Sequence, residues 1–194
     1  MHVQIDGERD ILPFVSVVVP VYNGRATIAD CIESLLAQDY PAGRYEIIVV
    51  DNNSTDGTPE IVAEYPVTLL YEREIQTSYA ARNRGIRQAR GEIVAFTDAD
   101  CVAEPQWLRE LVRPFSDPAV GGVGGEVLDY EPTNLVDRFL HDRGMFRRYQ
   151  SEDAFLPILL AGSTAYRREC LMAVGMFNAN LYTAADIDLS WRVQ

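Results

Sequence analysis

Short apolar runs alternate along the first half of the chain with longer segments in which apolar side chains recur every three or four positions. The runs predict β-strands over residues 14–20, 45–51, 67–72 and 92–98. The periodic segments predict helices over residues 27–38, 59–65 and 78–90. Strands that are apolar on both faces suit a parallel sheet covered by helices on each side. The pattern therefore predicts a doubly wound, mostly parallel α/β sheet flanked by helices.

Polar residues predict where two of these helices begin. Thr27 and Asp30 have the spacing of a capping box at the start of the first helix. Thr58 followed by Pro59 is typical of an N-cap and a first helical position.

The second half of the chain is less regular. The sequence predicts helices over 104–115 and 134–150, a glycine-rich strand over 119–131, and a strand that leads into a helix over 161–170. No repeat, low-complexity tract or linker divides the chain, so residues 1–194 are expected to form one domain.

Composition and charge narrow the range of partners. The 194 residues are 47% apolar and 24% charged, which is an ordinary globular composition. The formal net charge of −12 argues against a nucleic-acid partner, because nucleic-acid binding depends on clustered Lys and Arg. Phosphate can still bind locally where a divalent cation supplies the positive charge.

The cysteines and the apolar runs bear on the cellular setting. Cys31, Cys101 and Cys170 are far apart and lack the spacing of a metal site, and Cys31 falls on the apolar face of its predicted helix. A reduced setting is the simplest interpretation. The sequence has no signal-peptide pattern and no apolar run of about 20 residues. A cytoplasmic protein is expected, with a peripheral contact to the inner face of the cell membrane left open.

Polar side chains follow three of the predicted strands. Tyr22 and Asn23 come after the first strand, residues 51–54 after the second, and Asp98 and Asp100 after the fourth. Ligands of open α/β sheets bind outside the carboxyl ends of the strands. We therefore expect these three clusters to share one crevice.

Asp98 and Asp100 allow two interpretations when they are considered alone. An isolated Asp-x-Asp is typical of a polar turn or a helix N-cap. At the carboxyl end of a strand, such a pair also suits Mg²⁺ or Mn²⁺, held through one carboxylate with substrate phosphate and water as the other ligands. The neighbouring polar clusters favour the cation site.

Four segments, taken in order, resemble the family 2 glycosyltransferases, which have the nucleotide-sugar-binding GT-A fold. They are VSVVVPVYN, EIIVVDNNSTDGT, ARNRGI followed by ARGEIVAFTDADC, and AADIDLSWRV. They cover nearly the whole chain in the family's approximate spacing. The resemblance implies a nucleotide-sugar-binding half at about 14–102 and an acceptor-side half at about 103–194. Because the chain stops within a predicted helix, a truncated C-terminus is expected.

The resemblance also implies roles at the donor site. Asp100 would ligate the metal ion, and Asp98 would contact the ribose or the ion's water shell. Asp51 and Asn52 would face the nucleobase. Many family members have Asp where this chain has Asn52, so the choice of base stays open, with a UDP-sugar slightly favoured.

Three further residues would line the same pocket, namely Pro20, Val21 and Tyr22, although packing explains Tyr22 equally well. Arg82 and Arg84 are candidates to pair with the diphosphate. Alternate positions of a helix face different ways, so only one arginine is expected to face the site, and Arg82 is favoured.

The last segment, AADIDLSWR, resembles the family's Glu-Asp-x-Asp-Leu-x-x-Arg pattern. The resemblance implies that Asp186 is the general base. Ala185 departs from the pattern, because many members have Glu there. Asp188 is explained by its favourable interaction with the positive end of a helix dipole.

The function expected is that of an inverting, metal-dependent glycosyltransferase in polysaccharide or glycolipid synthesis. It would move a sugar from a nucleoside-diphosphate-sugar to a hydroxyl of a carbohydrate or lipid-linked acceptor. The alternative is a catalytically silent nucleotide-sugar-binding module. A sugar nucleotidyltransferase is less favoured, since no glycine-rich basic loop follows the first strand. A glycoside hydrolase also uses two carboxylates, but it needs no nucleotide pocket.

Overall fold

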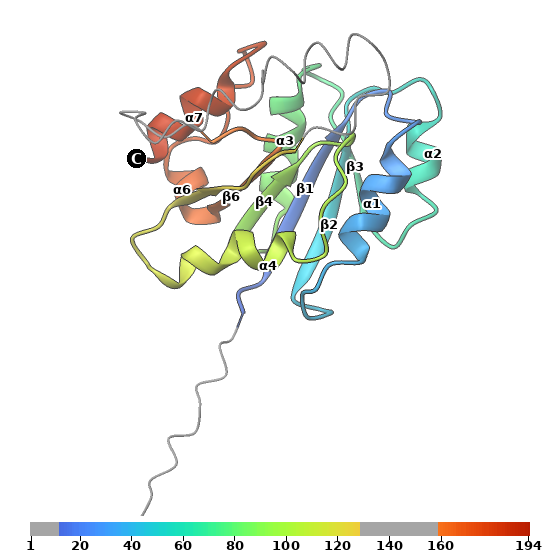
Figure 1. Cartoon of the computed structure of the whole chain (residues 1–194). Helices are drawn as coiled ribbons and strands as arrows, with labels where there is room; N and C mark the ends of the chain where they lie inside the picture. Colours follow the sequence, from blue (N-terminus) through green and yellow to red (C-terminus); the bar gives the residue numbers. More distant parts are fainter. Residues whose placement is uncertain (1–11, 129–158) are drawn as a thin grey trace, which may run out of the picture.

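The computed structural model describes residues 12–128 and 159–194. Within these ranges six strands form one sheet in the order β3-β2-β1-β4-β6-β5 (Figure 1). The four neighbouring strands β3, β2, β1 and β4 are parallel to one another. The strands are β1 (Val15–Val21), β2 (Tyr45–Asp51), β3 (Thr68–Tyr71), β4 (Ile93–Thr97), β5 (Gly122–Gly124) and β6 (Ser163–Arg167). β6 pairs antiparallel with β4 and with β5. The predicted doubly wound, mostly parallel sheet is confirmed.

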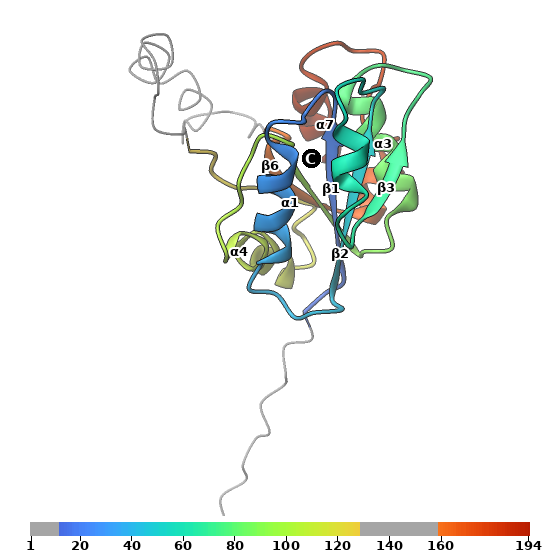
Figure 2. The ribbon, with the colours of Figure 1, turned by 90° about the vertical axis from the view of Figure 1, so that its right-hand side faces the viewer.

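Helices cover both faces of this sheet. They are α1 (Ile28–Leu36), α2 (Thr58–Val62), α3 (Ser78–Gln88), α4 (Trp107–Val112), α6 (Arg168–Ala173) and α7 (Ala185–Val193), with a 3₁₀ helix at Arg113–Ser116. Seen nearly edge-on, the sheet has α1 and α4 on one side and α3 on the other (Figure 2). None of the described helices is both long and apolar enough to span a bilayer.

Alternate residues of the central strands divide the core into two parts. Val17 and Val19 of β1 pack with α1, α2 and α4, whereas Val18 packs with α3, α6 and α7. This division follows from the two-residue period of a strand. Both sides of β1 are fully buried, which explains the continuous apolar run in the sequence.

The closest packing of a helix on the sheet occurs where α3 crosses β1. A Cβ atom added at Gly85 would overlap the side chain of Val18. Glycine therefore lets the helix backbone approach the strand. This contact places the amino end of α3 beside the carboxyl ends of β1 and β4.

Two predicted helix starts are wrong in detail. Thr27 precedes α1 but makes no capping bond, because its hydroxyl donates to Gly24 O at 3.4 Å. α2 begins at Thr58 with Gly57 as its N-cap, one residue earlier than predicted, so Pro59 is the second helical residue. Thr58 does not act as a cap, because its hydroxyl donates to Asp56 Oδ1 at 2.5 Å.

The second half of the chain bears out the prediction in part. The helix predicted over 104–115 begins only at Trp107 and tightens into a 3₁₀ turn at Arg113, where Pro114 supplies no backbone N–H. The glycine-rich strand is limited to β5 within the described residues, and residues 129–131 of that prediction lie outside them. β6 leads directly into α6 as predicted. The helix predicted over 134–150 also lies outside the described residues.

Candidate active site

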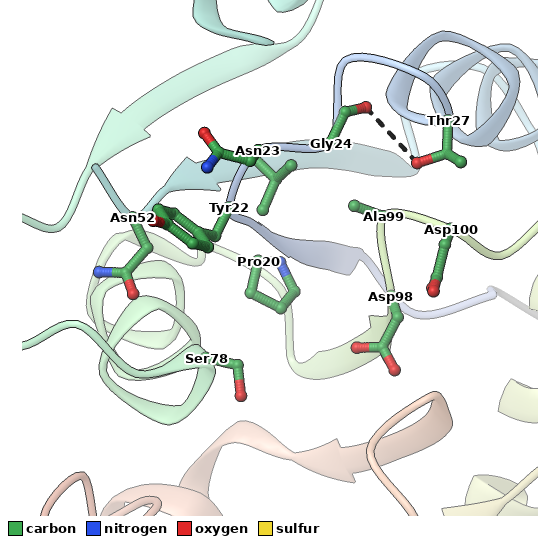
Figure 3. Close-up of a pocket in the computed structure, with 11 residues that line it drawn as sticks. Pro20, Tyr22, Asn23, Gly24, Thr27, Asn52, Ser78, Asp98, Ala99 and Asp100 are labelled. Atoms are coloured by element: carbon green, nitrogen blue, oxygen red, sulfur yellow. Dashed lines mark hydrogen bonds between the residues drawn. The ribbon is translucent and has the colours of Figure 1, made fainter. Parts of the chain in front are cut away.

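A cavity of about 340 Å³ opens at the carboxyl edge of the parallel strands (Figure 3). It lies among the ends of β1, β2 and β4 and the start of α3, as expected for an open α/β sheet. Its lining residues are Pro20, Val21, Tyr22, Asn23, Gly24, Thr27, Asn52, Ser78, Asp98, Ala99 and Asp100. The structure thus brings together the three polar clusters that the sequence predicted to converge.

Hydrogen bonds join the loop after β1 to the loop after β2. Asn23, with a left-handed φ of 50°, accepts Thr55 N–H on its side-chain oxygen at 2.8 Å and donates its own N–H to Ser54 Oγ at 2.9 Å. Asparagine tolerates this backbone conformation better than most residues. The two loops therefore form one wall of the cavity. Tyr22, 55% exposed, stands on this wall with Asn52 nearby (Figure 3).

Asn52 presents only its side-chain oxygen to a ligand. Its amide nitrogen donates to Glu72 O and to Ile75 O, both at 3.0 Å. Two carbonyl partners identify this atom as nitrogen, because only a donor satisfies them. Both amide hydrogens are thus committed, so Asn52 cannot donate to a carbonyl group of a bound base. The oxygen remains as an acceptor on the cavity wall.

Asp51 lies behind the cavity wall and is not among the residues that line the cavity. It is only 3% exposed, and its Oδ2 accepts Ser54 N–H at 3.2 Å. Its Oδ1 is buried with no hydrogen-bond partner among the described residues. A buried carboxylate oxygen without a donor is costly, so a ligand N–H that reaches it would bind favourably.

Asp98 and Asp100 occupy the side of the cavity opposite Asn52 (Figure 3). Asp98 Oδ1 accepts a hydrogen bond from the buried Arg82 guanidinium and forms an ion pair with it. Asp100 is exposed, and its Oδ1 accepts a weak hydrogen bond from the Cys101 thiol at 3.9 Å. One carboxylate is therefore committed to a protein cation, and the other is available to a ligand.

Arg82 and Arg84 face different ways, as the helical spacing predicted. Arg82 is 3% exposed and lies near the rings of Tyr79 and Phe177, at 5.8 and 6.0 Å from their centroids. Arg84 is exposed. Arg82 does not line the cavity and reaches it only through Asp98. Its contact with a diphosphate stays a prediction.

Two cysteines support the loop that carries the carboxylate pair. The Cys31 thiol donates to Asp98 O at 3.5 Å, and the backbone N–H of Cys101 donates to the same oxygen at 3.1 Å. Burial, followed by the effects of Cys101, Asp100 and Asp98, raises the pKa of Cys31 to about 12. Burial, followed by Asp98 and Asp100, also raises the pKa of Cys101. Both cysteines therefore remain neutral thiols, and all three cysteines of the chain are unpaired.

A divalent cation fits this site only if a ligand completes its coordination. Within residues 12–128 and 159–194, no three His, Cys, Asp or Glu side chains gather closely enough to hold a metal. Mg²⁺ and Mn²⁺ sites that act on phosphates commonly use one or two protein carboxylates together with phosphate oxygens and water. Asp100, exposed and uncommitted, suits that arrangement, with Asp98 beside it.

Asp186 lies at the amino end of α7 and connects to the carboxylate pair through one short loop. Its Oδ2 accepts Ala161 N–H at 3.5 Å. The next residue, Gly162, lies against Asp98, since a Cβ added there would be 3.3 Å from Asp98 Oδ2. Residues 161–162 therefore lie between Asp186 and the carboxylate pair of Asp98 and Asp100.

Sequence reasoning missed two residues of this site. Ser78 lines the cavity, and the hydroxyl of Tyr79 contacts Asp186 Oδ1 at 3.4 Å. Ser78 could have been found, because a helix that follows a parallel strand begins at the carboxyl edge of the sheet. The contact between Tyr79 and Asp186 joins residues 107 positions apart and left no local signal.

Solved structures with the same fold identify the class. A mannosyltransferase from Pyrobaculum calidifontis, PcManGT, in complex with GDP-Man and Mn²⁺, superposes with a TM-score of 0.77 at 31% identity, covering 93% of this chain and 52% of that one. S. aureus TarS 1–349 in complex with UDP-GlcNAc superposes with a TM-score of 0.66 at 24% identity, covering 92% and 52%. Together with the cavity at the strand ends, they define the fold as that of the GT-A glycosyltransferases.

The chain belongs to glycosyl transferase family 2, whose family model matches residues 16–175. The glycosyltransferase AglE of Haloferax volcanii is 47% identical over 121 residues, which are 60% of this chain and 40% of that protein. A beta-monoglucosyldiacylglycerol synthase of Nostoc sp. is 37% identical over 119 residues, 58% of this chain and 25% of that protein. The matched part thus spans less than half of either relative. The predicted membership of this family is confirmed, and the fourth motif, AADIDLSWRV, lies beyond the residues that the family model matches.

Proposed function

We propose that this chain is the donor-binding and catalytic part of an inverting glycosyltransferase that moves a sugar from a nucleoside-diphosphate-sugar to an acceptor hydroxyl. One observation carries the proposal. Asn52 and the carboxylate pair of Asp98 and Asp100 line one cavity, and a third carboxylate, Asp186, contacts the loop at residues 161–162 that lies against Asp98. Transfer from a nucleotide sugar needs these three components in one place.

The donor's base would bind between Tyr22 and Asn52. The side-chain oxygen of Asn52 accepts an N–H of the base, and both uracil and guanine have one on the edge that pairs with other bases. Structural neighbours are described in complex with GDP-Man and with UDP-GlcNAc, so both bases fit related sites. Pro20 and Val21 supply the apolar floor.

Asp100, with Asp98 beside it, would hold a divalent cation, Mn²⁺ or Mg²⁺, together with the diphosphate. When bound, such an ion neutralises the negative charge that develops on the departing nucleoside diphosphate. Asp98 remains oriented by its ion pair with Arg82. The neighbour that contains GDP-Man also contains Mn²⁺, which supports this assignment.

Asp186 would act as the general base. It takes the proton from the acceptor hydroxyl, whose oxygen then attacks the anomeric carbon from the face opposite the diphosphate. A single displacement of this kind inverts the anomeric configuration. A carbohydrate or lipid-linked acceptor agrees with the names of the relatives, which include a glycolipid synthase.

Binding and turnover of the full-length protein test this proposal. UDP-, GDP- and dTDP-sugars would be screened for binding with Mn²⁺, and transfer or donor hydrolysis would be followed with those that bind. We expect Asp186→Asn to keep donor affinity and to lower kcat by about 10²–10⁴-fold, the usual contribution of a general base. Asp188→Asn, two residues along α7, is the control and should keep turnover.

Three results would contradict the proposal in different ways. Wild-type turnover in Asp186→Asn would show that another group is the base. Donor binding without either transfer or hydrolysis in the full-length protein would instead support a silent nucleotide-sugar-binding module. A product that keeps the donor's anomeric configuration would exclude the single displacement.

A further inference from the structure

Tyr79 connects α3 to the proposed base. It is the second residue of α3 and is 9% exposed. Its hydroxyl donates to Asp186 Oδ1 at 3.4 Å, a long hydrogen bond of the kind that tightens in catalytic complexes. The backbone N–H of Ala185 lies close enough to the same hydroxyl to lower the pKa of Tyr79. Tyr79 therefore contacts the side chain of Asp186 and lies beside the backbone that precedes it.

The contact with Asp186 sets the direction of the hydroxyl proton. A tyrosine hydroxyl has one proton, and an ionised carboxylate can only accept, so the proton points to Asp186. α7 has no side-chain cap of its own, since its N-cap residue is Ala184 in a left-handed conformation with φ of 62°.

The ring of Tyr79 is held rigidly. It stacks on Phe177 with centroids 5.7 Å apart and an angle of 22° between the planes. Asn83, one turn along α3, fixes the backbone of Phe177 by donating to its carbonyl at 2.8 Å and accepting its N–H at 3.0 Å. A ring packed in this way holds its hydroxyl group in one position.

The Tyr79 hydroxyl also keeps the proton that it donates to Asp186. Burial raises its pKa, and the negative charge of Asp186 raises it further, against smaller opposing effects of Ala185 N–H and the Arg82 cation. The other groups near Asp186 are Tyr166 of β6, whose burial raises its pKa to about 12, and Asp188, which is paired with Arg192 on α7 at 2.7 Å. Among the described residues, Tyr79 supplies the side-chain hydroxyl that contacts the Asp186 carboxylate.

We propose that Tyr79 is a positioning residue for Asp186, a role that rests on the proposed function of Asp186 as the base. It contacts Oδ1, which also accepts Ile187 N–H at 3.0 Å, while Oδ2 faces the loop at residues 161–162, next to the carboxylate pair. Ala185 is fully buried and offers the base no acidic or polar neighbour. The orientation of the base therefore depends on one backbone group of its own helix and on one side chain from a distant helix.

The test compares Tyr79→Phe with Tyr65→Phe in the full-length protein. Tyr65 is a matched control, because its hydroxyl also donates to a carboxylate, Glu33 Oε1 at 2.8 Å, but away from the cavity. Hydrolysis of GDP-Man and of UDP-GlcNAc would be measured from pH 5 to 9. For Tyr79→Phe we expect kcat to fall about tenfold with donor KM unchanged, and the acidic limb of the rate profile to move to higher pH. Tyr65→Phe should match the wild type.

A second readout does not depend on turnover. The carboxyl carbon resonance of Asp186, observed by ¹³C NMR at constant pH, should shift in Tyr79→Phe and not in Tyr65→Phe. An unchanged resonance, or wild-type kcat and pH profile in a folded Tyr79→Phe protein, overturns the inference. If Asp186→Asn keeps full turnover while the resonance still shifts in Tyr79→Phe, the contact stands and the proposed base is wrong.

Discussion

At the scale of single residues, the site depends on which polar atoms already have a hydrogen-bond or ion-pair partner within the protein. Asp98 is occupied by Arg82, whereas Asp100 is free. This division resolves the repulsion expected between two carboxylates one residue apart, because a buried guanidinium offsets the charge of one of them. Asn52 shows the same principle, since both its donors are used and only its oxygen faces a ligand.

Asn52→Asp tests this reading of the amide. Aspartate cannot donate, so the carbonyl groups of Glu72 and Ile75 would lose their partner and face a carboxylate. We expect the free energy of unfolding to fall by about 1–3 kcal/mol, measured by denaturant titration at pH 7. The neighbouring change Asn53→Asp is the control, because that position has a φ of 68° that both residue types tolerate, and it should be nearly neutral. Equal stability of the two variants would show that the Asn52 bonds contribute little.

At the scale of secondary-structure elements, α3 organises the site. Its first turn supplies Ser78 to the cavity and Tyr79 to Asp186, and its second turn supplies Arg82 to Asp98. These three contacts reach different parts of the site from one rigid helix. Their relative placement depends on how closely α3 packs on β1, which Gly85 permits.

Gly85→Ala should therefore affect stability and site geometry together. The added methyl group would overlap Val18, forcing the helix away from the strand. Overpacking of this kind costs about 1–3 kcal/mol, well above the small gain in helix propensity from alanine. We expect a lower melting temperature and weaker donor binding. Arg84→Ala, on the exposed face of the same helix, should change neither. A more stable Gly85→Ala variant would contradict the packing argument.

At the scale of the whole molecule, the sequence predicted the sheet and the meeting of its polar loops. Parallel strands share a carboxyl edge, so Tyr22, Asn52 and Asp98 could be placed together without a structure. The connection between Tyr79 and Asp186 could not, because helical periodicity indicates which face is buried but not what it meets. The two hydrogen bonds that the Asn52 amide donates could not be predicted either, because they depend on where the chain runs after the edge strand β3. The predicted cap at Thr27 failed because Gly24 O competes for its hydroxyl.

The overall charge makes the cation central to the account. A chain with a formal net charge of −12 repels a bare diphosphate, and the carboxylate pair adds to that repulsion at the cavity. Arg82 offsets only part of this charge, because it is paired with Asp98. We therefore expect strong donor binding to require an additional positive charge at Asp100.

Calorimetric titration of GDP and of UDP, each with and without Mn²⁺, tests this claim most directly. The comparison uses the wild type, Asp100→Ala, and Asp30→Ala, which removes the same charge from an exposed position on α1. We predict that Mn²⁺ strengthens binding of one nucleotide by at least about tenfold, or 1.4 kcal/mol, in the wild type and in Asp30→Ala. In Asp100→Ala this gain should be lost. Binding that is independent of Mn²⁺, or an equal gain in Asp100→Ala, would contradict the account.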